Sequence, residues 1–500
     1  MEDIITLDTA LGNLAEFDQG KPSIDFASKK RQALKKEVLA AYAAGRGDKK
    51  TINEEIAFTM KELKAFDAAY PRKSLTLEQK MIRSSLKEDV DSAKMALSCS
   101  GVTYDPELVK NDVIISVRHL KEYFKAGDFK TKAVHDVSFD VKTGECFGLV
   151  GESGCGKTTT GRTIIGLYKP TSGEIYYKGY RIAAGSRWNE KEIKWSTIRA
   201  KDKIKELEFQ KKEAMAAHDD PNAKAEEAKA YDDKIAKVKE ELREVVATQK
   251  AAIRKIKYDN DYTNVKLRNE IQMIFQDPID SLDPRMTVES IIAEGLHIQG
   301  KHDRKENEEV VAEALKKVGL IPEYASRYPH EFSGGQRQRI GIARALVMNP
   351  KVLICDEPIS ALDVSIRAQV LNLLNEIKEE MGLTMIFIAH DLSVVKYFCD
   401  RIGVMYFGEM VELATSDELF AHPLHPYTKA LLSAIPKPDP RSEKNRTRLA
   451  YDPRASHDYS KQRPSMREIL PGHFILCNDE EEAKYLQEIK ALDKKKKGGK

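Results

Sequence analysis

The chain carries the stretch Gly151-Glu152-Ser153-Gly154-Cys155-Gly156-Lys157-Thr158 directly after the short apolar run 145–150. This stretch fits the pattern G-x-x-x-x-G-K-[ST], whose glycines let backbone N–H groups turn inward around phosphate oxygens. A helix is expected from Thr158 onward, with its positive end facing the same anion. Lys157 is expected to reach the β- and γ-phosphates, and the Thr158 hydroxyl to ligate Mg²⁺. The stretch therefore predicts an α/β domain in which a buried strand, a phosphate loop and a helix follow one another.

A second apolar run ends in two acidic residues, Val352-Leu353-Ile354-Cys355-Asp356-Glu357. Carboxylates at the end of a buried strand are rarely needed for packing. Downstream of a phosphate loop, Asp356 is expected to hold the Mg²⁺ shell, and Glu357 to orient and deprotonate the attacking water. The pair therefore predicts that the chain hydrolyses the nucleotide it binds.

A third element, Ser333-Gly334-Gly335-Gln336-Arg337, precedes the helical run 338–348. Small residues and a serine at a helix start form an anion site, although such a serine also serves as a plain N-cap. With its neighbours, Phe332 to Arg339, this element resembles the signature of the ABC ATPases. Three further elements are similar to those of the same family, namely the Q-loop at Gln276, the D-loop in Ser360-Ala361-Leu362-Asp363, and the switch histidine at His390.

The resemblance implies an ABC-type P-loop ATPase with a RecA-like core, an antiparallel β subdomain and a helical signature subdomain. It also implies that two such domains pair head to tail and enclose ATP between the phosphate loop of one and the signature of the other. The residues implied in ATP binding are Phe124, stacked on adenine, and Gly151, Glu152, Ser153, Gly154, Cys155, Gly156, Lys157, Thr158, Thr159, Ser333, Gly334, Gly335, Gln336 and Asp363. Those implied in Mg²⁺ binding are Thr158, Gln276 and Asp356, and those in catalysis are Glu357, His390 and Gln276.

Segments around these elements resemble the peptide/nickel importer group, especially its F-type oligopeptide subunit. They include 271–278, 281–286, Tyr328-Pro329-His330-Glu331 and 422–431, and the resemblance covers about 110–199 and 269–440. The function it implies is ATP hydrolysis that powers import of oligopeptides or dipeptides. The implied partners are two transmembrane permease subunits, a second ABC ATPase subunit in a heterodimer and, indirectly, an extracytoplasmic peptide-binding protein. The chain would then lie peripherally on the cytoplasmic face of the membrane.

Three regions lie outside this resemblance, and each has its own pattern. Residues 1–109 show helical spacing and predict a helical extension of the 110–440 ATP-binding domain, with Thr76 and Gln79 as a capping box. Within 200–268, apolar residues keep a 4,3 spacing that predicts an inserted antiparallel coiled-coil hairpin, whose second arm spans about 30 residues. Residues 441–500 are expected to form a C-terminal extension that ends in a disordered lysine tail, solvated or touching anionic lipid.

Composition excludes several classes of protein. The net charge of +3 is too small to suggest nucleic acid as the main partner. No apolar run approaches the ~18–20 residues that span a bilayer, and the acidic N-terminus does not resemble a secretory signal, so a cytosolic chain is expected. The six cysteines lack metal-ligand spacing.

Two of the cysteines are of special interest. Many importer relatives carry four cysteines after the core, which resemble an iron–sulfur site. Here Cys477 alone follows Cys399, and one thiolate cannot hold a cluster that needs four, so no iron–sulfur cluster is expected. Cys155 lies in the phosphate loop near a helix N-terminus, a setting that can lower the pKa of a thiol. Alkylation of Cys155 is therefore predicted to block nucleotide binding.

Other functions stay open at this point. A non-transport ABC ATPase of the DNA-repair type is one alternative, although the long coil of that class follows the Q-loop, whereas here it precedes Gln276. A non-hydrolysing regulatory subunit is a second, against which Glu357, His390 and the full signature argue. A subunit that imports nickel or another small solute is a third, because the permease and the external binding protein largely set the solute.

Overall fold

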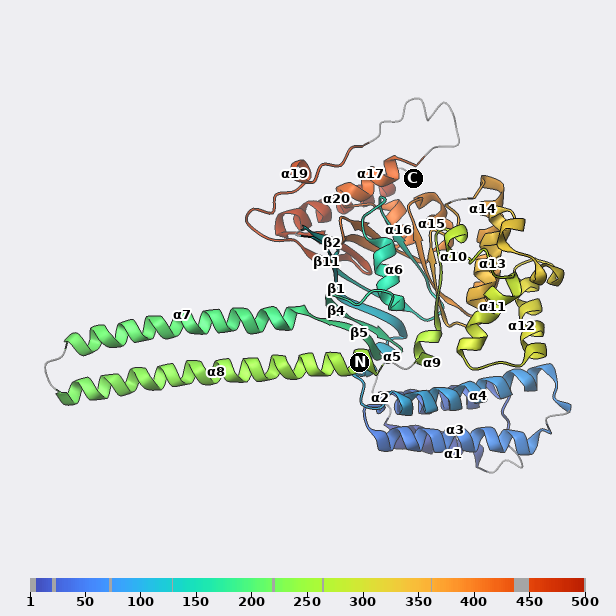
Figure 1. Ribbon diagram of the computed structural model, residues 1–500, viewed down its shortest axis with the longest axis horizontal. Coiled ribbons are helices and arrows are strands. Elements are labelled where there is room, and N and C mark those ends of the chain that lie inside the picture. The colour runs from blue at the N-terminus through green and yellow to red at the C-terminus, as the bar shows by residue number, and fades with distance from the viewer. Residues whose placement is uncertain are drawn as a thin grey trace.

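The computed structural model describes residues 6–19, 24–71, 74–127, 129–217, 221–262, 265–360, 362–435 and 449–498. In this part of the chain the strands form two sheets, one of four and one of eight strands (Figure 1). The strands are β1 (Val113–Ala126), β2 (Phe129–Lys142), β3 (Cys146–Val150), β4 (Ser172–Tyr177), β5 (Tyr180–Ser186), β6 (Ile271–Ile274), β7 (Val352–Asp356), β8 (Thr384–Ala389), β9 (Arg401–Tyr406), β10 (Glu409–Thr415), β11 (Ser465–Leu470) and β12 (His473–Cys477).

The helices cover the sheets and form two projecting units. They are α1 (Leu7–Asp18), α2 (Lys29–Ala44), α3 (Lys49–Ala69), α4 (Leu77–Ser98), α5 (Pro106–Lys110), α6 (Lys157–Ile165), α7 (Arg187–Ala217), α8 (Pro221–Asp261), α9 (Val265–Asn269), α10 (Pro278–Ser281), α11 (Val288–Ile298), α12 (Arg304–Lys317), α13 (Gly334–Leu346), α14 (Val364–Met381), α15 (Leu392–Phe398), α16 (Ser416–Ala421), α17 (Pro426–Ser433), α19 (Pro453–Ser456) and α20 (Asp479–Gly498), with the 3-10 helices η2 (Pro322–Ser326) and η3 (Pro329–Glu331).

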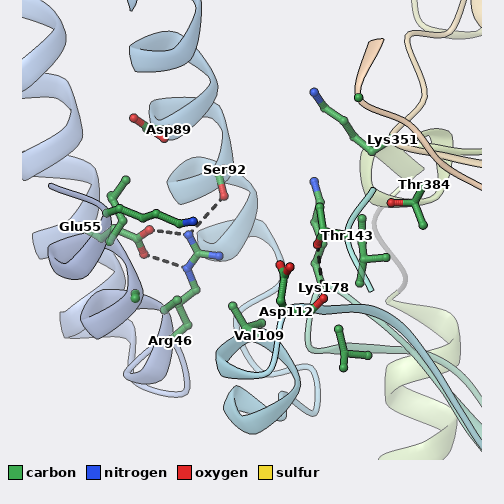
Figure 2. Close-up of a pocket in the computed structure, with 17 residues that line it drawn as sticks. Arg46, Glu55, Asp89, Ser92, Val109, Asp112, Thr143, Lys178, Lys351 and Thr384 are labelled. Atoms are coloured by element: carbon green, nitrogen blue, oxygen red, sulfur yellow. Dashed lines mark hydrogen bonds and ion pairs between the residues drawn. The ribbon is translucent and has the colours of Figure 1, made fainter. Parts of the chain in front are cut away.

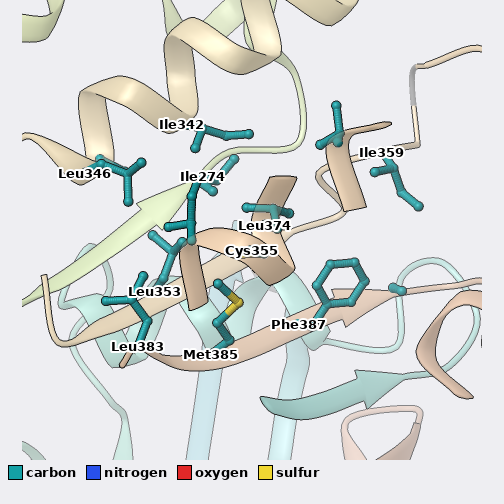
Figure 3. Close-up of a cluster of buried hydrophobic side chains, with 14 of the residues drawn as sticks. Ile274, Ile342, Leu346, Leu353, Cys355, Ile359, Leu374, Leu383, Met385 and Phe387 are labelled. Atoms are coloured by element: carbon teal, nitrogen blue, oxygen red, sulfur yellow. The ribbon is translucent and has the colours of Figure 1, made fainter. Parts of the chain in front are cut away.

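The eight-stranded sheet has the order β11-β12-β10-β9-β3-β8-β7-β6, and its strands from β9 to β6 are parallel. Every residue of β3, β7 and β8 is buried, as expected for apolar runs covered on both faces. On one face, Leu353, Met385 and Phe387 pack against Ile342 of α13 and Leu374 of α14 (Figure 3). Parallel strands place their carboxyl ends at one edge, and in such sheets ligands bind at that edge.

The four-stranded sheet has the order β2-β1-β4-β5, and all of its strands are antiparallel. Helices α10 to α13 form a separate helical unit against the edge strand β6 (Figure 1). The RecA-like core, the antiparallel β subdomain and the helical signature subdomain expected from the sequence are therefore all present. None of the helices in the described residues is long and apolar enough to cross a membrane.

The N-terminal helices α1 to α4 form a bundle beside the two sheets (Figure 1). The capping box of Thr76 and Gln79 opens α4, as the sequence predicts. Ile52 and Ala96 share a buried cluster with Tyr177 and Tyr180 of the four-stranded sheet, and the Tyr104 hydroxyl donates a hydrogen bond to the carbonyl of Ala43 (2.8 Å). Shared apolar burial therefore fixes the extension to the ATP-binding domain.

Helices α7 and α8 form the inserted hairpin, which projects away from the sheets (Figure 1). The expected range 200–268 and the expected arm of about 30 residues are wrong. The arms contain 31 and 41 residues, and α7 begins at Arg187, directly after β5. Lys-, Glu- and Ala-rich sequence favours helix without a buried seam, so the helices extend beyond the 4,3 pattern. Gln249, the polar residue in that pattern, accepts a hydrogen bond from Asn189 on the other arm (2.7 Å).

A buried carboxylate anchors the base of the hairpin. Asp259 is 0 % exposed and accepts hydrogen bonds from Arg181 Nε of β5 (2.8 Å) and from the Thr103 hydroxyl of the segment that follows α4 (2.6 Å). Lys255 lies 3.1 Å from the same carboxylate. Asp259 therefore ties the hairpin both to the four-stranded sheet and to the N-terminal extension.

Asp259→Ala is expected to lower the free energy of unfolding by about 3 kcal/mol, the low end of the range for a broken buried ion pair, because the buried guanidinium of Arg181 then keeps only Glu174 (2.7 Å) as a charge partner. Urea unfolding followed by circular dichroism measures the change. Glu240→Ala is the matched control, because its ion pair with Arg243 on α8 is exposed and is expected to contribute less than about 1 kcal/mol. Equal stability of the two variants would show that Asp259 is not the anchor.

The C-terminal extension differs from the sequence expectation. Strands β11 and β12 form a hairpin that adds to the eight-stranded sheet beside β10. The expected disordered lysine tail is instead part of α20 as far as Gly498, whereas Gly499 and Lys500 lie outside the described residues. Four acidic residues in the first turn of α20 complement the helix dipole, which favours the helix.

Candidate functional site

The phosphate loop connects the end of β3 to the start of α6, and two of its glycines are required by close backbone contacts. A Cβ atom at Gly151 would lie 2.2 Å from the carbonyl oxygen of Met405, and one at Gly156 would lie 2.2 Å from that of Ala133. Gly156 also has a φ of +103°, which L side chains rarely adopt. The loop therefore turns tightly against its neighbours, with Glu152, Ser153 and Gly154 exposed.

Lys157 is buried at the start of α6 and closes the loop from inside. Its Nζ donates hydrogen bonds to the carbonyls of Gly151 (2.8 Å) and Glu152 (2.9 Å). An ammonium held by neutral carbonyls, with the Cys155 sulfur 3.8 Å away, can move to phosphate oxygens, which bind it more strongly. Thr158 and Thr159 follow on the first turn of α6, and both are partly exposed.

Asp356 lies at the end of β7, opposite Thr158. The Thr158 hydroxyl donates a hydrogen bond to Asp356 Oδ1 (2.8 Å), whereas Asp356 Oδ2 is buried and has no hydrogen-bond partner among the described residues. Burial raises the pKa of Asp356, and the Thr158 hydrogen bond opposes that rise. A carboxylate oxygen left unpaired beside a threonine hydroxyl fits Mg²⁺, which binds oxygen ligands.

Glu357 follows β7 with a φ of +44°, a left-handed conformation that is costly for a residue with a Cβ. Its Oε2 accepts a hydrogen bond from Gln276 Nε2 (3.3 Å) and lies 3.0 Å from Nδ1 of His390. Gln276 follows β6 and His390 follows β8, so three parallel strands present these residues at one edge of the sheet. The structure thus assembles the three residues that the sequence assigns to catalysis.

The signature residues lie at the start of α13, which belongs to the helical unit against β6 (Figure 1). Ser333 and Gln336 form a reciprocal capping box, and Ser333 and Gly334 are exposed. Gly335 is buried against Ile366, which a Cβ atom would approach to 2.6 Å. The D-loop residue Asp363 is exposed at the start of α14, and Ala361 lies outside the described residues.

Phe124 lies away from this edge of the sheet, and the pKa of the Cys155 thiol differs from the sequence expectation. The Phe124 ring meets the Tyr168 ring edge-on (5.2 Å), beyond the end of α6. Burial raises the pKa of the Cys155 thiol, although Lys157 Nζ, 3.8 Å from the sulfur, opposes the rise. The expected low thiol pKa is therefore wrong: Cys155 is only 5 % exposed, and burial destabilises its thiolate more than Lys157 stabilises it.

Sequence reasoning missed Tyr427, whose side chain forms a hydrogen bond with the loop. The hydroxyl of Tyr427 accepts a hydrogen bond from the backbone N–H of Glu152 (2.9 Å). Tyr427 lies in the segment 422–431, which the sequence singles out only by resemblance. No local pattern links it to a loop 275 residues away.

Two cavities lie at the surface of this domain, one beside the predicted site and one away from it. One of about 960 Å³ is lined by Gln276, Phe275, Leu167, Ile298 and Arg344, and so lies directly beside the Q-loop. The other, of about 420 Å³, lies between the N-terminal extension and the ATP-binding domain (Figure 2), and none of the residues that line it is a predicted site residue. In the residues described, no group of three or more His, Cys, Asp or Glu side chains could hold a metal ion by itself.

Known proteins are similar to most of this chain. The ABC transporter family model matches residues 134–255 and 247–360, and the model of the oligopeptide/dipeptide transporter C-terminal region matches residues 411–461. The oligopeptide transport ATP-binding protein OppF of Bacillus subtilis is 47% identical over 369 residues, which cover 74% of this chain and 97% of that protein.

Two further relatives are similar to about the same share of this chain. The oligopeptide transport ATP-binding protein AmiF of Streptococcus pneumoniae is 43% identical over 376 residues, 75% of this chain and 98% of that protein. The dipeptide transport ATP-binding protein DppF of Lactococcus lactis is 43% identical over 376 residues, 74% of this chain and 96% of that protein.

Proposed function

Because this chain belongs to the oligopeptide/dipeptide family of ABC transporter ATP-binding proteins, we propose that the edge formed by β3, β6, β7 and β8 is its site of ATP hydrolysis. The chain is the ATP-binding subunit of an importer for oligopeptides or dipeptides. The observation that supports the proposed site best is the buried, unpaired Oδ2 of Asp356 beside the Thr158 hydroxyl and the phosphate loop.

In the proposed mechanism, backbone N–H groups of the phosphate loop other than that of Glu152 hold the phosphates of ATP, and Lys157 leaves the carbonyls of Gly151 and Glu152 to bind them. Thr158, Asp356 and Gln276 would hold Mg²⁺, which supplies positive charge next to the phosphates. Phe124 would stack on the adenine ring.

Glu357 acts as the general base in the proposed mechanism. Its carboxylate takes a proton from water while the water oxygen forms a bond to the γ-phosphorus. The bond from that phosphorus to the bridging oxygen breaks, which yields ADP and phosphate. His390 and Gln276, both within hydrogen-bond distance of Oε2, hold the carboxylate in position.

We infer the partner subunits from surfaces that are exposed in a single copy of the chain. The exposed signature residues Ser333 and Gly334 and the exposed Asp363 would close over ATP bound to a second ABC ATPase subunit, and the reverse contact would complete the site of this chain. Leu167 and Ile298 are 57% and 70% exposed beside the cavity next to Gln276, and such apolar surface is typical of an interaction site. We assign it to one of two permease subunits, with the chain held peripherally on the cytoplasmic face of the membrane and a peptide-binding protein acting on the other side.

The solute is tested in cells in which this chain is replaced by its variants, with uptake of labelled peptide and of labelled nickel measured side by side. Glu357→Gln is expected to lower uptake of a labelled tetrapeptide by roughly 100-fold, because transport stops with hydrolysis. Glu323→Gln, which changes an exposed carboxylate in η2, is the control and should leave uptake unchanged. Normal peptide uptake together with loss of labelled nickel uptake would identify a nickel importer instead, and DNA-stimulated ATP hydrolysis would favour the DNA-repair alternative.

A further inference from the structure

The C-terminal part of the ATP-binding domain contacts the phosphate loop through Tyr427, near the start of α17. The hydroxyl of Tyr427 accepts a hydrogen bond from the backbone N–H of Glu152 (2.9 Å), the second residue of the loop. Tyr427 is 2% exposed, so its hydroxyl is not free to turn to bulk water. This bond therefore fixes a loop residue that is otherwise exposed.

The bond matters because the other side-chain support of this part of the loop is temporary. Lys157 holds the carbonyls of Gly151 and Glu152 in the structure, but the proposed function requires its ammonium to move to the phosphates. After that movement, Tyr427 supplies the one remaining side-chain hydrogen bond to residues 151–154, among the contacts of the described residues. The loop would then depend on this bond to keep its shape.

Tyr427 is itself held rigidly. Its ring packs against Tyr406 (centroids 4.5 Å apart) and Tyr451 (5.4 Å), and its backbone N–H donates to Nδ1 of His425 (3.2 Å). Burial lowers the pKa of His425 to about 3, so the ring is neutral and Nδ1 is free to accept. The carboxylate of Glu412 accepts from the backbone N–H groups of Leu424 and His425 (2.9 and 3.1 Å), which fixes the start of α17 to β10.

We propose that Tyr427 is a positioning residue for nucleotide binding, which holds the phosphate loop in its binding shape through the N–H of Glu152. The proposal rests on the function proposed above and adds a residue that contacts neither the nucleotide nor the attacking water. Because the loop cradles the α- and β-phosphates, Tyr427 affects ATP and ADP alike. AMP, with one phosphate, depends on the loop less.

The test uses the full chain with Tyr427→Phe, which removes the hydroxyl and keeps the ring. Titration with fluorescent ATP, ADP and AMP analogues in the presence of Mg²⁺ measures affinity, and steady-state ATP hydrolysis separates KM from kcat. The Kd for ATP and for ADP is expected to rise roughly 3- to 10-fold, the effect of one neutral hydrogen bond. The Kd for AMP and the kcat at saturating ATP are expected to change less than about two-fold, since the reacting atoms are untouched.

Tyr451→Phe is the matched control, because Tyr451 belongs to the same ring cluster but makes no hydrogen bond to the loop among those found in the described residues. It should bind ATP as the unmodified chain does. Wild-type affinity in Tyr427→Phe, or an equal loss in both variants, would overturn the proposal, the second result because it would trace the effect to ring packing. If Lys157→Ala also binds ATP normally, the proposed function itself fails, whereas loss in Lys157→Ala alone rejects only the role of Tyr427.

Discussion

Glu357→Gln is expected to lower the rate of ATP hydrolysis by about 10²- to 10⁴-fold while ATP affinity changes by less than a few-fold. A general base contributes about that much to a rate, and an amide cannot take the proton of the attacking water. The amide oxygen can still accept the hydrogen bond from Gln276, so the local structure is preserved. Single-turnover hydrolysis and nucleotide titration of the same preparation measure the two quantities.

The control for this prediction is Glu323→Gln, which changes an exposed carboxylate outside the site. It should hydrolyse ATP at the unmodified rate. Hydrolysis by Glu357→Gln at more than about a tenth of the normal rate would place the general base elsewhere. His390, the other titratable group 3.0 Å from Oε2, would then be the next residue to test.

Lys157→Ala is expected to weaken ATP binding by about 10- to 100-fold, because hydrogen bonds to a charged group contribute roughly 1.5–3 kcal/mol. Lys157 is 4% exposed, so its removal also leaves a small cavity and two carbonyls without their donor. Lys157→Met keeps most of the apolar stem and removes only the charge, and it is expected to show the same loss of affinity. Isothermal titration with ATP measures both variants.

Lys169→Ala is the control for the loss of a positive charge near α6, because Lys169 is exposed. Screening by solvent makes its expected effect less than about two-fold. If both Lys157 variants bind ATP like the unmodified chain, the phosphates do not sit on the loop, and the whole assignment of the site is wrong. If only Lys157→Ala loses affinity, the loss comes from the cavity and not from the charge.

Most of the site residues that could be predicted from the sequence lie in contiguous motifs. The glycines of the phosphate loop predict its backbone conformation from the local sequence alone. The apolar run before Asp356-Glu357 likewise predicts a buried strand that ends at the pair. Gln276 and His390 are single residues in ordinary surroundings, and they were found only through resemblance to the ABC ATPases. Their distance from Glu357, 81 and 33 residues along the chain, shows why no local spacing could join them.

Local sequence patterns predicted some helices and strands incompletely. The 4,3 spacing indicated the hairpin but not its length, because polar residues with high helix propensity extend α7 and α8 without contributing to the seam. Strand β11 was missed because Arg467 and Glu468 interrupt its apolar residues, and an edge strand needs little apolar sequence. Disorder was expected for the lysine-rich tail, whose backbone instead continues α20 as far as Gly498.

By itself, the sequence determined the ATPase fold, the phosphate loop, the Asp356-Glu357 pair and the family, since each depends on residues that lie close together in the chain. Only the tertiary structure decided which distant groups meet: Glu357 with Gln276 and His390, Asp259 with Thr103 and Arg181, and Tyr427 with the loop. The reason is physical. Local spacing specifies backbone conformation, whereas the pairing of buried polar groups depends on how strands and helices from remote segments pack, which no short stretch of sequence encodes.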